Sequence, residues 1–77
     1  MKEKLNTIFN ELFNVLEVRD DMTPEKVDGW DSFSHIELVL ELEKAFTITI
    51  PTSDAIKLIS IKEIMNYISS IDAKREL

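Results

Sequence analysis

The junction where a loop becomes a helix, residues 29–38 (GWDSFSHIEL), constrains the fold of this chain most strongly. Gly29 is the only glycine in the sequence. Asp31 and Ser32 are favoured N-cap residues, because their side-chain oxygens accept hydrogen bonds from the free N–H groups of a first helical turn. An apolar-rich segment without glycine or proline follows. We therefore predict that a helix starts here and holds the Ser32 hydroxyl near the surface, at the positive end of the helix.

Length and cysteine content limit the class of protein. The 77 residues predict a single domain, 1–77, with a modest core, because a chain of this size buries only about 60% of its unfolded surface. The sequence has no cysteine, which excludes disulfides, thiolate nucleophiles and cysteine zinc sites. A core and a deep substrate cavity of several hundred cubic ångströms are not expected together in such a chain. An enzyme is therefore disfavoured.

Hydrophobic periodicity predicts an all-α protein, a small four-helix bundle with three main helices and a short third helix. A strand-like alternation in residues 47–52 has no second strand to pair with, so we expect an extended connector that buries Ile48 or Ile50 and stops at Pro51. A Ser60–Glu63 capping box precedes the last helix. The expected helices span residues 2–17, 32–46, 53 to 58 or 59, and 61–71, with a fraying tail after them. The apolar stripe of the first helix consists of Leu5, Ile8, Phe9, Leu12, Val15 and Leu16.

A long acidic loop, residues 18–31, joins the first two helices. It exceeds the usual connection of ~4–6 residues, so apolar side chains of its own are needed to hold it in place. We expect Trp30 to anchor the loop on the helices; the alternative is a solvent-facing recognition tryptophan. The four candidate anchors are Val18, Met22, Val27 and Trp30.

The second helix carries two apolar stripes. The inward stripe is centred on Leu42. The outward stripe begins one residue after Ser32, with acidic residues among and beside it. One interpretation is that the long loop or the last helix partly covers this stripe. The other is that the stripe binds a partner protein, in which case its apolar side chains provide contact area and its acidic side chains fix the alignment of the partner. The inward residues are Leu38, Val39, Leu42, Ala45 and Phe46, and the outward ones are Phe33, Ile36 and Leu40, with Glu37 and Lys44 among them and Glu41 on the flank.

The net charge of −6 is concentrated around Ser32. Residues 20–46 contain eight acidic residues against two lysines, which accounts for the whole excess. This charge disfavours nucleic-acid binding and favours basic partner proteins, although a solubilising surface is the plain alternative. No apolar run approaches the ~20 residues that span a bilayer, and no signal peptide is visible. We expect a cytoplasmic monomer without a membrane partner.

Catalysis at Ser32 is a weak hypothesis. His35, the only histidine, lies one helical turn away, but on the buried side of the helix. No glycine-rich turn supplies an oxyanion hole, which a nucleophilic serine also needs. The acids of the loop do not follow the spacing of a calcium loop. We therefore expect neither an enzyme nor a metal site, and we expect His35 to be a partly buried packing residue.

These features together resemble the acyl carrier protein family, including peptidyl carriers, over nearly the whole chain. The family's hallmark is Asp-Ser-Leu before an amphipathic acidic helix. Here Asp31-Ser32-Phe33 opens such a helix, which continues through the segment 36–46 (IELVLELEKAF) and is followed by an isoleucine-proline pair at Pro51. The first helix, the long acidic loop and the total length agree with the family as well.

The resemblance implies a specific chemistry. Ser32 would be esterified with 4′-phosphopantetheine by a magnesium-dependent phosphopantetheinyl transferase that uses coenzyme A. The thiol of that arm would carry acyl or aminoacyl groups as thioesters between biosynthetic enzymes with basic docking surfaces. The residues that fall where family members meet their partner enzymes are Asp31, Phe33, Ile36, Glu37, Leu40 and Glu41.

Three departures from the family pattern bear on the pathway. Phe33 replaces the usual leucine, Trp30 precedes the aspartate as it often does in carriers outside primary fatty-acid synthesis, and the terminal segments are charge-balanced. They favour a discrete carrier of polyketide, peptide or modified-lipid synthesis. The alternatives are a housekeeping carrier of fatty-acid synthesis and an interaction module of similar fold that carries no arm.

Overall fold

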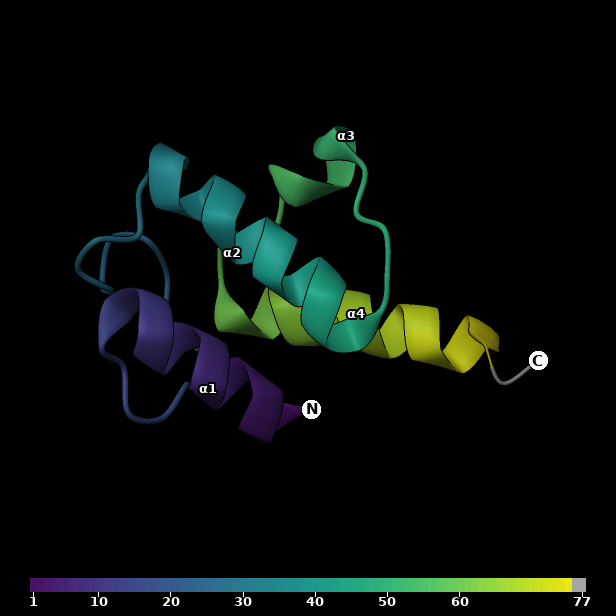
Figure 1. Cartoon of the computed structure of the whole chain (residues 1–77), viewed down its shortest axis with the longest axis horizontal. Coiled ribbons are helices and arrows are strands. Elements are labelled where there is room, and N and C mark those ends of the chain that lie inside the picture. Colours follow the sequence, from purple (N-terminus) through teal and green to yellow (C-terminus); the bar gives the residue numbers. More distant parts are fainter. Residues whose placement is uncertain (76–77) are drawn as a thin grey trace.

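Four helices and no strands make up residues 1–75, the part of the chain that the computed structural model describes. The helices are α1 (Lys2–Phe13), α2 (Ser32–Phe46), α3 (Thr52–Ala55) and α4 (Ile61–Arg75). The three long helices lie around a common centre, and the short α3 lies on the outside, beside α2 (Figure 1). The all-α prediction is confirmed, with the long loop between α1 and α2. In the described residues no helix has the length and apolarity needed to cross a membrane.

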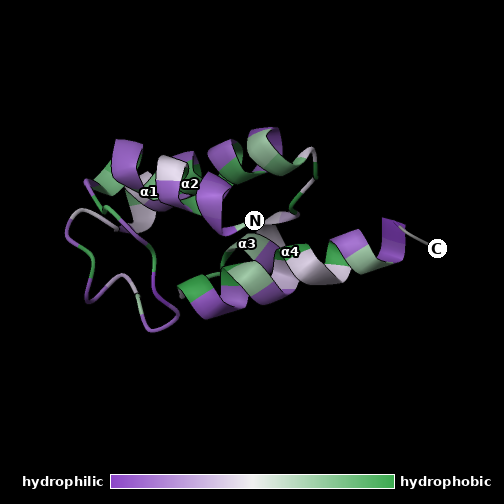
Figure 2. Ribbon diagram, turned by 90° about the horizontal axis from the view of Figure 1, so that it is seen from below, coloured by the Kyte–Doolittle hydropathy of each residue, from purple (hydrophilic) through white to green (hydrophobic). Residues whose placement is uncertain are grey.

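One hydrophobic core joins α1, α2, α4 and the long loop. Along each long helix, hydrophobic and hydrophilic residues alternate as in helices that bury one face (Figure 2). The predicted centre of the inward stripe is right, since Leu38 and Leu42 are fully buried. The largest fully buried side chains are Leu5, Phe9, Val18, Leu38, Leu42, Ile61, Ile64 and Ile68.

Trp30 anchors the long loop, as predicted. Its side chain is 3% exposed and packs against two rings of α1, edge-on to Phe9 with ring centroids 5.3 Å apart and stacked on Phe13 at 5.9 Å. The three other expected anchors, Val18, Met22 and Val27, are buried too. Because Trp30 is followed directly by the first residues of α2, its packing on α1 fixes where that helix starts.

The first helix is shorter than predicted, and Leu16 is not a core residue. α1 ends at Phe13, because Asn14 adopts the left-handed conformation with φ of 59°, which asparagine tolerates at a helix C-terminus. The chain then turns back, and the Val18 N–H donates to the Asn6 side chain at 2.8 Å. Leu16 is consequently 87% exposed. The prediction followed the hydrophobic spacing and did not consider that Asn14 could end the helix as its C-cap residue.

The last helix is longer than predicted. α4 continues to Arg75, whose guanidinium donates to the backbone carbonyls of Phe46 and Thr47, at the C-terminal end of α2. Lys4 donates to the neighbouring Ala45 carbonyl at 3.1 Å. Cations from two helices thus satisfy free carbonyls at the negative end of α2. The expected fraying does not occur over residues 72–75, and the remaining two residues of the tail lie outside the described range.

The connector after α2 is extended, as expected, and buries both Ile48 and Ile50. The Glu43 carboxylate accepts from the Ile50 N–H at 2.8 Å, which satisfies a backbone donor that has no strand to pair with. α3 begins after Pro51 and is shorter than predicted, ending at Ala55. At the start of α4 the Ser60 hydroxyl accepts from the Glu63 N–H at 3.0 Å, so the serine half of the predicted capping box is confirmed. The Glu63 carboxylate accepts from the Ser60 hydroxyl at 3.2 Å, and not from the Ser60 N–H as the prediction required.

The core assignment predicts that Phe9→Ala lowers the free energy of unfolding by about 3–5 kcal/mol, because a fully buried aromatic ring is replaced by a cavity. The matched change Leu16→Ala is expected to alter it by less than about 0.5 kcal/mol, because Leu16 is exposed. Urea unfolding followed by circular dichroism measures both. A large loss for Leu16→Ala would show that α1 extends beyond Phe13.

Candidate functional site

Asp31 caps α2 and thereby places Ser32 in the first turn. The Asp31 carboxylate accepts from the N–H groups of Phe33 and Ser34 at 3.0 and 2.9 Å, and the Ser34 hydroxyl accepts from the Asp31 N–H at 2.8 Å. This reciprocal pattern is a capping box. The Ser34 hydroxyl also donates to the Gly29 carbonyl at 2.6 Å, which joins the end of the loop to the start of the helix.

The capping bonds lower the pKa of Asp31 below its ordinary value of 3.8. The main cause is the hydrogen bond from the Ser34 N–H, followed by the Ser34 side chain. Since these donors favour the ionised form, the carboxylate is charged at neutral pH and complements the positive end of α2.

The Ser32 side chain is left exposed by this arrangement. The hydrogen bonds at the junction engage Asp31 and Ser34, and none of them uses the Ser32 hydroxyl. Ser32 is the first residue of α2, where backbone N–H groups point outward and favour a negatively charged group. The predicted position of the Ser32 hydroxyl, at the surface and at the positive end of a helix, is confirmed.

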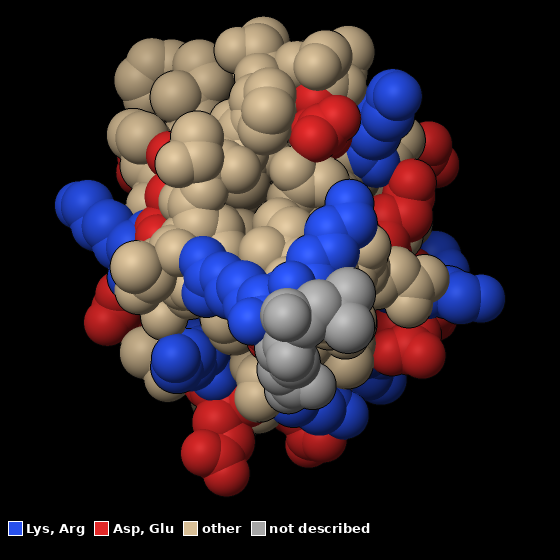
Figure 3. Space-filling model, turned by 90° about the vertical axis from the view of Figure 1, so that its right-hand side faces the viewer, with Lys and Arg blue, Asp and Glu red and all other residues tan. Residues whose placement is uncertain are grey.

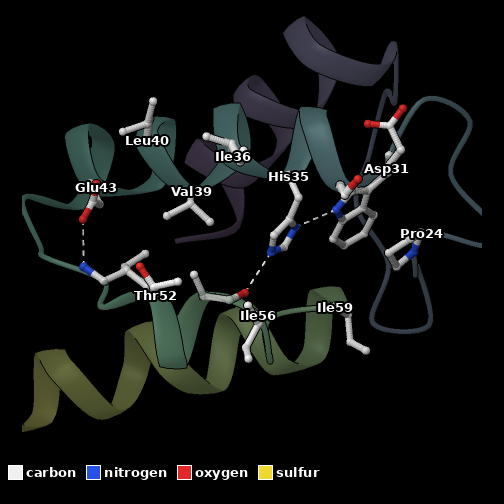
Figure 4. A pocket seen from close by; sticks show the side chains of 14 residues that line it. Pro24, Asp31, His35, Ile36, Val39, Leu40, Glu43, Thr52, Ile56 and Ile59 are labelled. Atoms are coloured by element: carbon white, nitrogen blue, oxygen red, sulfur yellow. Dashed lines mark hydrogen bonds between the residues drawn. The ribbon is translucent and has the colours of Figure 1, made fainter.

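A groove of about 570 Å³ starts beside Ser32 and runs between α2 and the segment 50–59 (Figure 4). We did not expect a hollow of this size in so small a chain. It is possible because the groove is open to solvent, with α3 as its outer wall, although the core residues Trp30 and Ile50 also line it. On the α2 side its residues are Ser32, His35, Ile36, Val39, Leu40 and Glu43, and across from them lie Ile50, Thr52, Ala55, Ile56 and Ile59.

The outward stripe of α2 is largely exposed, which argues against the interpretation that the long loop or the last helix covers it. Phe33, Ile36 and Leu40 are 74%, 62% and 51% exposed. Glu37 is exposed as well, and Glu41 is half-buried with its carboxylate 3.8 Å from the Lys44 amine. In the end-on view of Figure 3, uncharged side chains gather at the top, where Figure 1 places α2 and α3, and charged groups of both signs crowd the lower half.

His35 is half-buried, as expected, and both of its ring nitrogens have partners. Nδ1 lies 3.0 Å from the Trp30 indole nitrogen, and Nε2 lies 2.8 Å from the Ala55 carbonyl oxygen. Neither nitrogen is free to accept a proton from Ser32, as a general base must be. The geometry therefore argues against the hydrolase hypothesis.

The opposite wall of the groove was missed by the sequence analysis. Ile56 and Ile59 are 67% and 50% exposed, and both line the groove. Their three-residue spacing after a short helix was a usable signal, because two isoleucines on one side of a turn form an apolar edge. It was not recognised because residues 53 to 58 or 59 were expected to form a short helix whose apolar side chains were given no role.

The contribution of the Asp31 cap to stability should decrease as the pH is lowered. A lowered pKa in the folded state means that the charged cap stabilises the protein above about pH 3.8, and that this stabilisation is lost as pH falls through the folded-state pKa. We expect Asp31→Ala to lower Tm at pH 7, and the difference from the unsubstituted chain to shrink below pH 3.8. Asp31→Asn keeps an acceptor but does not titrate, so its Tm difference from Asp31→Ala should not change with pH. A pH-independent difference between the unsubstituted chain and Asp31→Ala would contradict this account.

The sequence is similar to those of several acyl carrier proteins. The acyl carrier protein of Campylobacter hominis is 36% identical over 77 aligned positions, which cover 88% of this chain and 98% of the relative. That of Campylobacter fetus is 36% identical over 73 positions, covering 83% and 95%. The acyl carrier protein of Campylobacter jejuni is 49% identical over 43 positions, or 56% of each chain. No protein-family model matches the chain. At this identity and coverage, the chain belongs to the acyl carrier protein family.

Proposed function

We propose that this protein carries acyl groups as thioesters on a 4′-phosphopantetheine arm attached to Ser32. The observation that supports it most is the position of the Ser32 hydroxyl: exposed, in the first turn of α2, and at the mouth of an apolar groove. Membership of the acyl carrier protein family supports the same role. The chain acts as a carrier for enzymes and not as a catalyst itself.

The residues around Ser32 fit the arm. A phosphodiester on the Ser32 oxygen would lie at the N-terminus of α2, whose dipole favours negative charge. The capping box leaves the serine free while holding its backbone in place. The apolar side chains Ile36, Val39 and Ile56 line the groove that begins there and offer a surface to the arm or to an attached hydrocarbon. When bound, the arm supplies the thiol that this cysteine-free chain lacks.

The exposed stripe of α2 is the proposed docking surface for partner enzymes. Phe33, Ile36 and Leu40 offer apolar contact area next to Ser32. Glu37 and Glu41 lie beside them and favour a basic partner, such as a transferase that brings coenzyme A. Asp31 completes this surface, and its charge is maintained by the cap. An acidic rim around apolar contacts would align a partner over the serine hydroxyl.

A specialised pathway is the finer part of the proposal. Phe33 projects a large ring at the position where the family usually has leucine, and it is 74% exposed. A partner shaped for leucine would meet additional volume there, which favours enzymes dedicated to this carrier. Housekeeping fatty-acid synthesis is the alternative, and replacement of a cell's own fatty-acid carrier by this chain would support that alternative.

Modification of Ser32 can be tested by intact mass. The chain, incubated with coenzyme A, magnesium and a promiscuous phosphopantetheinyl transferase, should gain the mass of one phosphopantetheinyl group. Ser32→Ala should gain nothing, because the transfer needs the serine oxygen. Ser34→Ala removes the other hydroxyl of the junction and should still be modified, though more slowly, because the capping bonds of that hydroxyl are lost.

An unchanged mass of the unsubstituted chain would favour the interaction module without an arm. A gain that persists in Ser32→Ala would show that another residue is the acceptor. Helical circular dichroism of each variant separates both outcomes from a failure to fold.

The docking surface makes a separate prediction. Reversing Glu37 and Glu41 to lysine should slow the modification roughly tenfold at low salt, because steering by opposite charge is lost. The same reversal at Glu3 and Glu17, which are exposed on or just after α1, makes an equal change in net charge and should have little effect. Initial rates at several salt concentrations measure both. Equal slowing by the two pairs would mean that only total charge matters.

A further inference from the structure

The outer wall of the groove packs on the core through Ala55 and its flanking residues, and two polar contacts tether it as well. α3 has no buried residue, although Ile50 before it and Leu58 after it are buried. One tether is the Tyr67 hydroxyl, which donates to the Asp54 carboxylate at 2.7 Å. Burial and that carboxylate raise the pKa of Tyr67 to about 12, so the phenol remains a donor at neutral pH. A wall that buries so little can move when its polar contacts break.

His35 makes the second tether, and it is the one that crosses the groove. Its Nε2 lies 2.8 Å from the Ala55 carbonyl oxygen at the end of α3, and its Nδ1 lies 3.0 Å from the indole nitrogen of Trp30. Figure 4 shows the ring extending from α2 across the groove, with a hydrogen bond on each side. We call this chain of contacts, from Trp30 through His35 to Ala55, the His35 bridge.

The chemistry of Trp30 determines the tautomer of His35. An indole N–H only donates, so Nδ1 of His35 must accept, and the imidazole proton must lie on Nε2. That proton is the one that reaches the Ala55 carbonyl. Both bonds are satisfied only by the neutral ring with this one tautomer. Trp30 therefore selects the form of His35 that can bind α3.

Trp30 is also a rigid base for the bridge. It is 3% exposed and packed on Phe9 and Phe13, and the His35 ring lies nearly parallel to it, at 14° with centroids 6.1 Å apart. The Trp30 and His35 rings thus connect the core to the Ala55 carbonyl of α3.

We propose that His35 is a positioning residue whose bridge holds α3 against α2 and so sets how far the groove opens beside Ser32. This inference rests on the proposed function in one respect only, namely that the groove receives the arm or its acyl group. The bridge itself can be tested on the unmodified chain, which keeps the two proposals separable.

The first test is amide hydrogen exchange of the unmodified chain by nuclear magnetic resonance. His35→Leu keeps the side-chain volume and removes the donor. Exchange of the Ala55 and Ile56 amides should become about fivefold faster or more, as expected for one lost hydrogen bond. The exchange rates of core amides, such as that of Leu42, should change only by the factor that corresponds to the change in the global free energy of unfolding.

Two further variants make this test specific. His35→Gln keeps a donor that reaches the Ala55 carbonyl, so protection of α3 should largely return. Ile36→Ala removes another side chain of the groove without a bond to α3, and should leave the exchange of α3 unchanged. In the unsubstituted chain, ring nitrogen shifts should show the proton on Nε2. Unchanged α3 exchange in His35→Leu, or a proton on Nδ1, would overturn the bridge.

The second test addresses the acyl group. The chain is loaded from octanoyl-coenzyme A by the transferase, and the thioester is cleaved with hydroxylamine. Cleavage should be severalfold faster in His35→Leu than in the unsubstituted chain, with His35→Gln in between, because a wider groove exposes the acyl arm. Equal rates alongside altered α3 exchange would overturn the positioning role and leave only a structural bridge. If no loading occurs, the proposed function fails, while the exchange result still decides the bridge.

Discussion

The packing of Trp30 on Phe9 and Phe13 is the interaction on which the site depends. The residue buried there is the last one before the cap, so a contact deep in the core determines the position of Asp31 and Ser32. Burial of a large aromatic side chain contributes about 2 kcal/mol or more, which offsets part of the cost of ordering a long loop. The backbone of the surface residue Ser32 is thereby tied to the core through its neighbours Trp30 and Asp31.

The indole N–H of Trp30 is connected, through His35, to α3 on the other side of the groove. This N–H fixes the tautomer of His35, and His35 reaches the carbonyl of Ala55 in α3. One buried side chain thus connects the segment that holds Ser32 with the opposite wall of the groove. The two functions proposed for the site, presenting a hydroxyl and receiving an apolar chain, would share this one structural base.

Several elements of the fold and of the site could be predicted because they depend on residues close together in the sequence. The cap at Asp31, the two stripes of α2 and the buried Trp30 follow from residue types and helical spacing over short distances. The end of α1 at Asn14 and the extension of α4 to Arg75 did not follow, because the first depends on a left-handed residue and the second on carbonyls of a distant helix. The groove and the His35 bridge combine residues from three segments, and periodicity within one segment carries no information about such combinations.

The central claim is that Ser32, and no other hydroxyl of the junction, carries the arm. Tandem mass spectrometry of the modified chain tests it most directly, because the tryptic peptide 27–44 contains Ser32 and Ser34 and no other serine. Fragment ions should place the phosphopantetheinyl group on Ser32. Fragments that place it on Ser34, or a peptide that stays unmodified while another one gains the group, would contradict the account.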